Sequence, residues 1–276
     1  MAAQVFNTMP FSLLYHKYMI PVSNEVTSMV LSYVEEKTNG RPLDMALDVG
    51  CGTGRYTLPL APHFKKVLGI DICDSQINVA KRYNTANNVS YMVASAERLP
   101  VENNSVDLVS SGLAAHFFTI DKFVNESVRV LKTNGCLAAH GYHPSSEIEY
   151  RDLSHGLNTV MSEVWNLMWQ QSTTPDLTQT GAHMLDQFQT LYEAIPLKDK
   201  KWVKDIPVKF QVSVPEIIGF IQSICVFQIY LEKNEKEAKQ FLAQTEERMR
   251  DVLGEEADSA RLNLHMKHYC VLACKH

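Results

Sequence analysis

Residues 47–54 read Leu-Asp-Val-Gly-Cys-Gly-Thr-Gly and hold the most informative pattern in the chain. The apolar residues from Met45 to Val49 predict a buried strand, and Tyr56 to Ala61 predicts a helix after the glycines. Glycine at every second position removes Cβ where the chain turns and lets backbone amides approach a ligand closely. In α/β sheets, ligands bind at the carboxyl ends of the strands. The segment therefore predicts a nucleotide site at the mouth of a sheet.

The spacing of the glycines separates two classes of nucleotide. The dinucleotide fingerprint is G-x-G-x-x-G/A, in which the third small residue packs the helix against the strand. Gly50 and Gly52 fit its first two positions, but Arg55 occupies the third and is too large for that packing. The pattern is instead G-x-G-x-G, with Asp48 just before it. The alternative is a glycine-rich turn that binds no ligand.

Two later segments fit the same scheme. Val67 to Asp71 predicts a second strand that ends in an acid about twenty residues after the loop, where a carboxylate can accept hydrogen bonds from ribose hydroxyls. A third strand is predicted over Val89 to Val93, followed by Ala-Ser-Ala-Glu-Arg-Leu-Pro at 94–100. Taken alone, Glu97 also fits a solvated surface acid, the commoner position of glutamate.

In order and spacing, the three segments resemble the motifs of the class I S-adenosylmethionine (SAM) methyltransferases. Residues 94–100 resemble the "DAE-x-LP" signature of this family, with Ser95 in place of the usual aspartate. The resemblance implies a SAM site formed by Asp48, Gly50, Gly52, Gly54, Asp71, Ala96 and Glu97. It places Asp48 and the glycine loop at the methionine part of SAM, Asp71 at the ribose, and Ala96 with Glu97 at the adenine.

Helix and strand patterns alternate from Ser23 to about Tyr142, which predicts an α/β fold with a doubly wound, mainly parallel sheet. Seven strands are expected near 45–49, 66–71, 89–93, 106–111, 136–141, 209–214 and 269–274. The resemblance implies a Rossmann-like sheet with an antiparallel last strand and a helical lid insertion. We expect one domain, with a SAM-binding core at about 23–142, the lid at about 147–205, and closing strands and helices at about 206–276.

The closest resemblance is to the small-molecule branch typified by trans-aconitate methyltransferase. Residues 15–21 resemble its N-terminal "Y-x-x-Y-R-P" segment, and residues 131–137 resemble its "LKPGG-x-L" turn. Met19 stands where relatives often carry arginine, and Phe117 stands where they place tryptophan. If that arginine helps bind an acidic acceptor, its absence makes a polyacid a less favoured substrate here.

Methyl transfer from a sulfonium needs alignment more than it needs a base. Near-attack alignment contributes about 7–11 kcal/mol, and a general base contributes about 10²–10⁴-fold. His116 is the leading candidate base because it follows the strand ending at Ser111 and imidazole has an ordinary pKa of about 6.5. His140 follows the next strand, and Tyr18 offers an aromatic face to positive charge, as does Tyr15. The alternatives are a histidine packed under the lid and an N-terminal helix docked on the core.

The expected lid carries an aromatic and methionine stripe that includes Trp165, Met168 and Trp169. Such a stripe fits an apolar acceptor pocket. It fits core packing between helices equally well, and core packing is commoner at helical spacing.

Composition limits the remaining classes of function. Of 276 residues, 45% are apolar, and the net charge is −5 without a dense Lys/Arg tract, so nucleic-acid binding is not expected. The six cysteines form no C-x-x-C pair or zinc-type array, which favours buried free thiols and no metal site. No signal-peptide pattern and no run of about 18 apolar residues is found, so we expect a cytoplasmic protein without a membrane span.

These observations lead to a SAM-dependent enzyme that methylates a small-molecule acceptor, with O-methylation slightly favoured over N-methylation. The alternative from another class is a catalytically silent SAM-fold subunit that binds a protein partner. A nucleic-acid methyltransferase is disfavoured because residues 110–113 read Ser-Ser-Gly-Leu rather than N-P-P-Y/F.

Overall fold

The strands of the protein join one seven-stranded sheet in the order β3-β2-β1-β4-β5-β7-β6. The structure is a computed structural model that describes residues 6–172 and 186–276. In chain order the strands are β1 (Leu43–Val49), β2 (Phe64–Asp71), β3 (Val89–Val93), β4 (Val106–Gly112), β5 (Leu131–Glu149), β6 (Asp199–Val212) and β7 (Leu262–Lys275). The helices are α2 (Met9–Tyr18), α3 (Asn24–Thr38), α4 (Asp74–Arg82), α5 (Ile120–Val130), α6 (Ser154–Ser172), α8 (Gln189–Ala194), α9 (Val214–Ser223), α10 (Cys225–Lys233) and α11 (Glu235–Leu253). Short 3₁₀ helices lie at η1 (Leu58–His63), η2 (Ala115–Phe117), η3 (Arg151–Leu153) and η4 (Gly254–Glu256).

The sheet topology confirms the expected fold class. Strands β1 to β5 pair in parallel, whereas β7 runs antiparallel to both of its neighbours, β5 and β6. Asp48 near the end of β1 is in register with Gly69 of β2 and with Ser110 of β4. The carboxyl ends of these three strands therefore meet at one edge, where the glycine loop begins.

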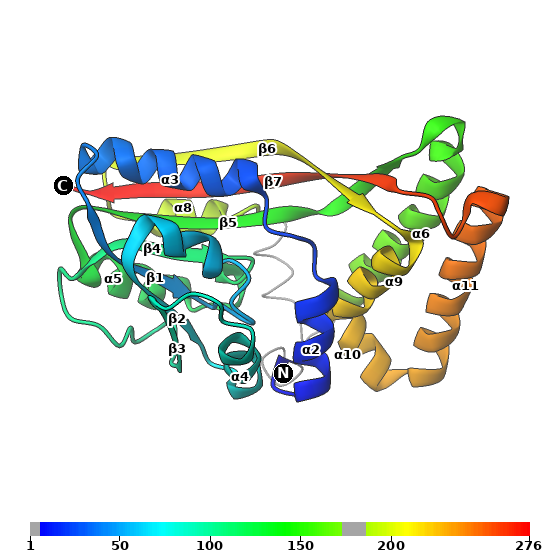
Figure 1. Cartoon of the computed structure of the whole chain (residues 1–276), viewed down its shortest axis with the longest axis horizontal. Helices are drawn as coiled ribbons and strands as arrows, with labels where there is room; N and C mark the ends of the chain where they lie inside the picture. Colours follow the sequence, from blue (N-terminus) through cyan, green and yellow to red (C-terminus); the bar gives the residue numbers. More distant parts are fainter. Residues whose placement is uncertain (1–5, 173–185) are drawn as a thin grey trace.

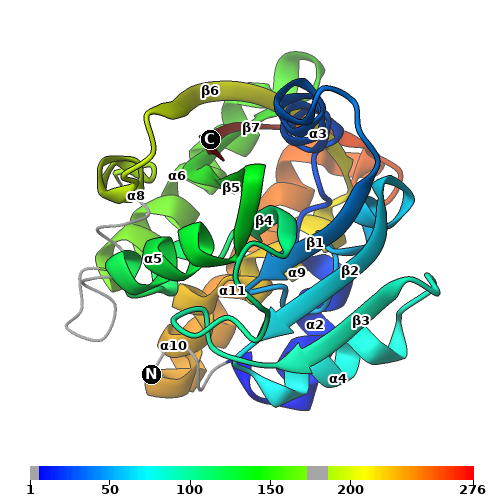
Figure 2. The ribbon, with the colours of Figure 1, turned by 90° about the vertical axis from the view of Figure 1, so that its left-hand side faces the viewer.

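Helices cover both faces of the sheet (Figure 2). On one face α3 and α4 bury Val26, Val30 and Ile77. On the other, α5 and α8 bury Phe123 and Leu191. Helix α3 ends at Thr38, with Asn39 as its C-cap in the left-handed conformation (φ 52°).

Three strands extend well beyond the parallel part of the sheet. Figure 1 shows β5, β6 and β7 reaching across to a group of helices, α6 and α9 to α11, at the far end of the molecule. The N-terminal helix α2 lies between that group and the parallel part (Figure 1). Leu157 of α6 and Met249 of α11 belong to the same buried cluster as Val26 and Ile77, so the core is continuous between the two parts.

The helix predicted over Tyr56 to Ala61 forms only in part, and as a 3₁₀ helix rather than an α-helix. The chain forms turns after the glycine loop and then the 3₁₀ helix η1, which contains Pro59 and Pro62. Proline has no N–H to donate and its ring clashes with the carbonyl four residues earlier, so an α-helix cannot run through Pro62.

The lid segment expected at about 147–205 is not helical at either end, because both ends belong to strands. β5 continues to Glu149, and β6 already begins at Asp199, within the segment assigned to the lid. β6 is an edge strand with a register break between Val203 and Ile206, where Asp205 has φ 55°. Edge strands tolerate charged residues and bulges, which explains why a Lys-rich segment without apolar alternation forms a strand here.

No single helix in the described ranges is long and apolar enough to cross a membrane. The pair α9 and α10 reaches that length and composition, but the two are bent by 75° and most of their residues are buried in the protein.

Candidate functional site

The loop after β1 is shaped by its three glycines. Gly50, Gly52 and Gly54 have φ values of 69°, 53° and 80°, in the left-handed region that side chains disfavour. A Cβ on Gly50 would lie 2.4 Å from Cβ of Ala114, and one on Gly54 would lie 2.4 Å from the hydroxyl of Tyr91. The loop therefore requires glycine both for its backbone conformation and for the close approach of its neighbours.

Asp71 lies directly against this loop. Its carboxylate accepts a hydrogen bond from the Gly52 N–H at 2.9 Å and another from the Cys73 N–H at 2.8 Å. Burial raises the pKa of Asp71, while these N–H donors oppose the rise. The acid at the end of β2 and the glycine loop thus form one unit.

Asp48 is fully buried beneath the loop. Thr57 donates a hydrogen bond from Oγ1 to Asp48 Oδ2 at 2.6 Å, whereas Oδ1 has no hydrogen-bond partner in the protein. Burial raises the pKa of Asp48 to about 7, and the Thr57 hydrogen bond only partly opposes this. Half of the carboxylate is therefore left for a ligand.

Other buried polar atoms near the loop are also unpaired. They include Thr53 Oγ1, the Tyr91 hydroxyl and both amide atoms of Gln76, whose Oε1 lies 3.4 Å from a Cβ position on Gly52. An unsatisfied buried polar group costs about 1–3 kcal/mol. Their concentration around three glycines fits a polar ligand that approaches the backbone closely.

The segment after β3 forms a different part of the site. Glu97 accepts hydrogen bonds from the Ser95 hydroxyl and from the Thr119 N–H, the latter at 3.0 Å. Burial raises the pKa of Glu97, but these hydrogen bonds outweigh it and lower the pKa overall. Glu97 therefore ties the loop after β3 to the loop before α5, and Ala96 beside it is buried. Ile72, which follows Asp71 and exposes 62% of its surface at the same edge, belongs to no motif and was not predicted from the sequence.

The N-terminal helix is attached to the glycine loop by Arg55. The guanidinium donates hydrogen bonds to the carbonyl oxygens of His16 and Ile20, at and just beyond the end of α2. Tyr15, on the same helix, lies 3.8 Å from a Cβ position on Gly52. Arg55 therefore replaces the small third residue of a dinucleotide loop with a link to a covering helix.

A cavity of about 50 Å³ adjoins Tyr15. It is formed by α2, the loop after β4, β5, β7 and the junction between α9 and α10. Its lining includes Tyr15, Met19, His116, Tyr142, Ile224 and Tyr269. The α9–α10 junction and Tyr269 carry no recognisable sequence motif, so their place in the wall of a site could not be predicted.

The predicted catalytic residues differ in whether they line the cavity. His116 lines the cavity and is buried, with its ring centre 4.1 Å from that of Phe117. Tyr18 packs instead against Gly219 of α9, where a Cβ would lie 2.2 Å from its ring, which matches the docked-helix alternative. Tyr15, rather than Tyr18, faces the cavity.

His140 lies outside the cavity lining. Its ring centre is 4.8 Å from that of Tyr56, and its Nδ1 is buried without a hydrogen-bond partner. Burial, and then the proximity of His268, lowers the pKa of His140 to about 3. At that pKa the imidazole is neutral at pH 7 but accepts a proton weakly, so its predicted catalytic role receives less support than that of His116.

The aromatic stripe of α6 does not line the cavity. Trp165 donates from Nε1 to Ser146 Oγ at 3.1 Å, Met168 is buried in the core, and Trp169 exposes 46% of its surface. The core-packing alternative therefore describes Trp165 and Met168, and Trp169 lies at the surface.

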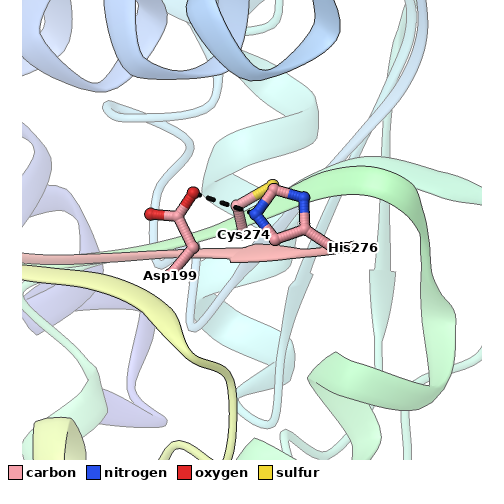
Figure 3. Close-up of side chains that lie close together, drawn as sticks. All are labelled: Asp199, Cys274 and His276. Carbon is pink, nitrogen blue, oxygen red and sulfur yellow. Dashed lines mark hydrogen bonds and ion pairs between the residues drawn. The ribbon is translucent and has the colours of Figure 1, made fainter.

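A cluster of metal-ligand residue types lies at the other end of the sheet (Figure 3). Asp199, Cys274 and His276 form the only such group found within residues 6–172 and 186–276. The Asp199 carboxylate already accepts a hydrogen bond from Lys37 Nζ at 2.8 Å, and His276 Nε2 lies 3.0 Å from it. Since the lysine ammonium supplies the positive charge at this carboxylate, the group is an ion-pair network that joins β6 to α3.

Comparison with known proteins agrees with this geometry. A family model described as a methyltransferase domain matches residues 47–139. A protein of Dictyostelium discoideum described as a methyltransferase is 24% identical over 95% of this chain and 92% of its own length. A protein of Saccharomyces cerevisiae described as an S-adenosylmethionine-dependent methyltransferase is 27% identical over 44% of this chain and 42% of its own length.

The fold also matches a solved structure. A protein from Anaeromyxobacter dehalogenans described as a type II methyltransferase superimposes with a TM-score of 0.70 at 20% identity, covering 94% of this chain and all of the other. The glycine loop and its acids lie within the matched domain, and the sheet order and antiparallel last strand agree with the matched fold. Residues 47–139 therefore form a SAM-dependent methyltransferase domain, and the chain as a whole is similar in sequence and fold to methyltransferases.

Proposed function

We propose that the glycine loop binds SAM and that the adjoining cavity binds a small-molecule methyl acceptor. The observation that carries this proposal is the position of Tyr15, which lies against Gly52 of the loop and also lines the cavity. One aromatic ring therefore separates a polar cradle from an apolar cavity. This is the arrangement needed to bring a donor and an acceptor together.

The residues around the loop fit the parts of SAM. The unpaired Oδ1 of Asp48 suits the amino-acid end of SAM, and the carboxylate of Asp71 at the end of β2 suits the ribose. Exposed Ile72 and buried Ala96 provide an apolar edge for the adenine. Glu97 supports this edge through its hydrogen bond from Thr119.

SAM supplies an activated methyl group, so the protein has chiefly to align and desolvate the acceptor. Alignment of this kind contributes about 7–11 kcal/mol. The rings of Tyr15 and Tyr142, both in the cavity wall, present faces that stabilise nearby positive charge.

O-methylation is favoured over N-methylation because of His116. Its imidazole lines the cavity and can accept the proton of a hydroxyl acceptor, which adds about 10²–10⁴-fold to the rate. No aspartate or glutamate in the described part of the chain lines this cavity to hold an ammonium group. His140 and Tyr18 lie outside the lining.

We further propose a single-domain, cytoplasmic enzyme that does not bind nucleic acid. The continuous core supports one domain, and six free, buried cysteines suit a reducing compartment. The net charge of −5 gives no electrostatic basis for binding a phosphate backbone. Assignment to the branch that resembles trans-aconitate methyltransferase stays a prediction.

Calorimetry with SAM tests the donor site. The wild type is expected to bind, and Asp71→Ala is expected to lose binding, while exposed Asp251→Ala on α11 binds normally. Absence of binding by the wild type, or unchanged binding by Asp71→Ala, would refute the proposal.

A screen with labelled SAM and fractionated metabolites then tests turnover. A labelled small-molecule product identified by mass analysis would exclude the catalytically silent subunit. Label incorporated only into protein or nucleic acid would contradict a small-molecule acceptor.

A further inference from the structure

We propose that the acceptor is a small, uncharged hydroxyl compound with an apolar body, and that the cavity selects against both carboxylate and ammonium acceptors. This inference rests on the proposed function, since it assumes that methyl transfer takes place in this cavity. It goes further by defining the charge and size of the molecule that the cavity accepts.

The cavity wall carries no formal charge. In the described ranges its lining contains no lysine, arginine, aspartate or glutamate. Met19, Ile224 and Val226 supply aliphatic surface, and their side chains are nearly excluded from solvent. An ionised acceptor placed here would lose its hydration without gaining a counter-ion, which costs several kcal/mol.

The charged groups that act on the rings of the cavity wall are already engaged elsewhere. Asp186, which raises the pKa of Tyr269, accepts hydrogen bonds from the N–H groups of Phe188 and Thr190. Arg55 is the cation adjoining this region, and its guanidinium donates to the carbonyl oxygens of His16 and Ile20. Asp71 is held by the N–H groups of Gly52 and Cys73. Recruiting Arg55 for a carboxylate would detach α2 from the loop, so none of these groups is a ready partner for a charged acceptor.

The polar atoms of the wall suit a hydroxyl group. Tyr142 and Tyr269 both line the cavity, and neither phenol has a hydrogen-bond partner among the described residues. Burial raises the pKa of both tyrosines, so each stays an O–H donor at neutral pH. Two neutral donors and the His116 imidazole can orient one acceptor oxygen without requiring it to be charged.

The transfer step balances with these groups alone. The acceptor oxygen forms the new O–CH₃ bond while the S–CH₃ bond of the donor breaks and its electron pair stays on sulfur. The hydroxyl proton passes to His116, which lines the same cavity. No metal, oxidant or further reagent is required.

The size of the cavity limits the acceptor further. Its volume of about 50 Å³ is far below the roughly 300–1,000 Å³ of sites that hold drug-sized ligands. Its wall is rich in aromatic rings, including Tyr15, Phe117, Tyr142 and Tyr269. A small alcohol matches these dimensions, whereas a single-ring phenol requires the wall to open around it, since benzene binds in a cavity of about 150 Å³.

A set of matched acceptors tests the charge preference with the full-length protein and labelled SAM. The compounds are 4-methylphenol, 4-hydroxybenzoate and tyramine, which share one phenol and differ in the charge of the opposite group. We expect kcat/KM for 4-methylphenol to exceed that of both charged compounds by at least about tenfold. Equal or higher values for a charged compound, or no methylation of 4-methylphenol while SAM binds, would overturn the inference. Failure to bind SAM in calorimetry would instead overturn the proposed function.

Substitutions in the cavity wall test whether the absence of charge there causes the preference for an uncharged acceptor. Met19→Arg adds a cation, so the kcat/KM ratio of 4-hydroxybenzoate to 4-methylphenol is expected to rise at least about tenfold, whereas Met19→Leu leaves it unchanged. Ile224→Arg places the same charge on another element and serves if Met19→Arg does not fold by circular dichroism. An unchanged ratio in a folded arginine variant would contradict the assignment of this cavity as the acceptor site.

Discussion

The donor side and the acceptor side of this site are built in opposite ways. The proposed donor side is a short loop with positive φ angles at Gly50, Gly52 and Gly54, surrounded by unpaired buried polar atoms of Asp48, Thr53, Gln76 and Tyr91. The proposed acceptor side collects aromatic and aliphatic residues from segments spread from Phe6 to Tyr269. In this proposal a polar cofactor is held by local backbone geometry, whereas the acceptor is selected by tertiary packing.

The largest expected effect is on the donor side, from Gly50→Ala. The new Cβ would meet Ala114 at 2.4 Å on a backbone with φ 69°, so we expect a loss of about 2–5 kcal/mol in unfolding free energy from strain and overpacking. Denaturant unfolding measures the loss. Gly40→Ala is the matched control because Gly40 has φ 66° and nothing within 4 Å of the added atom. A similar loss in both variants would show that backbone conformation, rather than close approach, makes glycine necessary at Gly50.

On the acceptor side, His116→Asn is expected to reduce kcat without weakening SAM binding. Loss of a general base lowers the rate by about 10²–10⁴-fold, while the dissociation constant for SAM should stay within about threefold. Single-turnover kinetics and calorimetry measure the two quantities. His155→Asn, on the exposed surface of α6, is the control. A normal rate across pH in His116→Asn would remove this residue from the base role.

Asp48→Asn should separate stability from function on the donor side. Because burial raises the pKa of Asp48 from 3.8 to about 7, the native state binds a proton there more tightly than the unfolded chain does. This stabilisation is present at acidic pH and is lost as pH rises through about 7. We therefore expect Asp48→Asn to be more stable than the wild type by about 1–4 kcal/mol at pH 8, while SAM binding falls.

The stability difference should shrink as pH falls from 8 towards 4. Thermal unfolding of both proteins across this range measures it, with Asp251→Asn as an exposed control. A pH-independent difference would show that the Asp48 carboxylate does not titrate in this window.

The smallest expected effect concerns the link between the two sides. Arg55→Lys removes the pair of guanidinium hydrogen bonds to His16 and Ile20, at a cost of about 1–3 kcal/mol. Faster amide hydrogen exchange in α2, with little change in the sheet, would confirm that Arg55 anchors the helix. Arg98→Lys, at an exposed position, should leave exchange in α2 unchanged.

The same contrast explains what the sequence could predict. The sheet and the donor loop follow from local patterns, because apolar strands, alternating glycines and terminal acids act within a few residues of one another. The positions of Asp48 and Asp71 at the loop were therefore predictable. The α-helix expected after the loop does not form, because Pro59 and Pro62 interrupt the apolar run and favour a short 3₁₀ helix.

The residues that line the cavity could not be predicted from local sequence patterns. Tyr15 and Tyr18 are three residues apart on one helix, yet only Tyr15 lines the cavity, because Gly219 of α9 admits the ring of Tyr18. The stripe on α6 has the periodicity of a pocket wall but packs into the core. Which apolar face lines a cavity is decided by the partner helix, whose docking no single-sequence pattern specifies.

The insertion of β7 between β5 and β6 has a consequence for folding during synthesis. β7 is synthesised after both of its neighbours. The edges of β5 and β6 that pair with β7 therefore stay unpaired until β7 has been made. Unpaired edges invite association between chains. Because Tyr269 comes from β7, the acceptor cavity is completed only when that gap closes. Pairing of β7 with both neighbours thus protects these edges from association and adds Tyr269 to the wall of the proposed acceptor cavity.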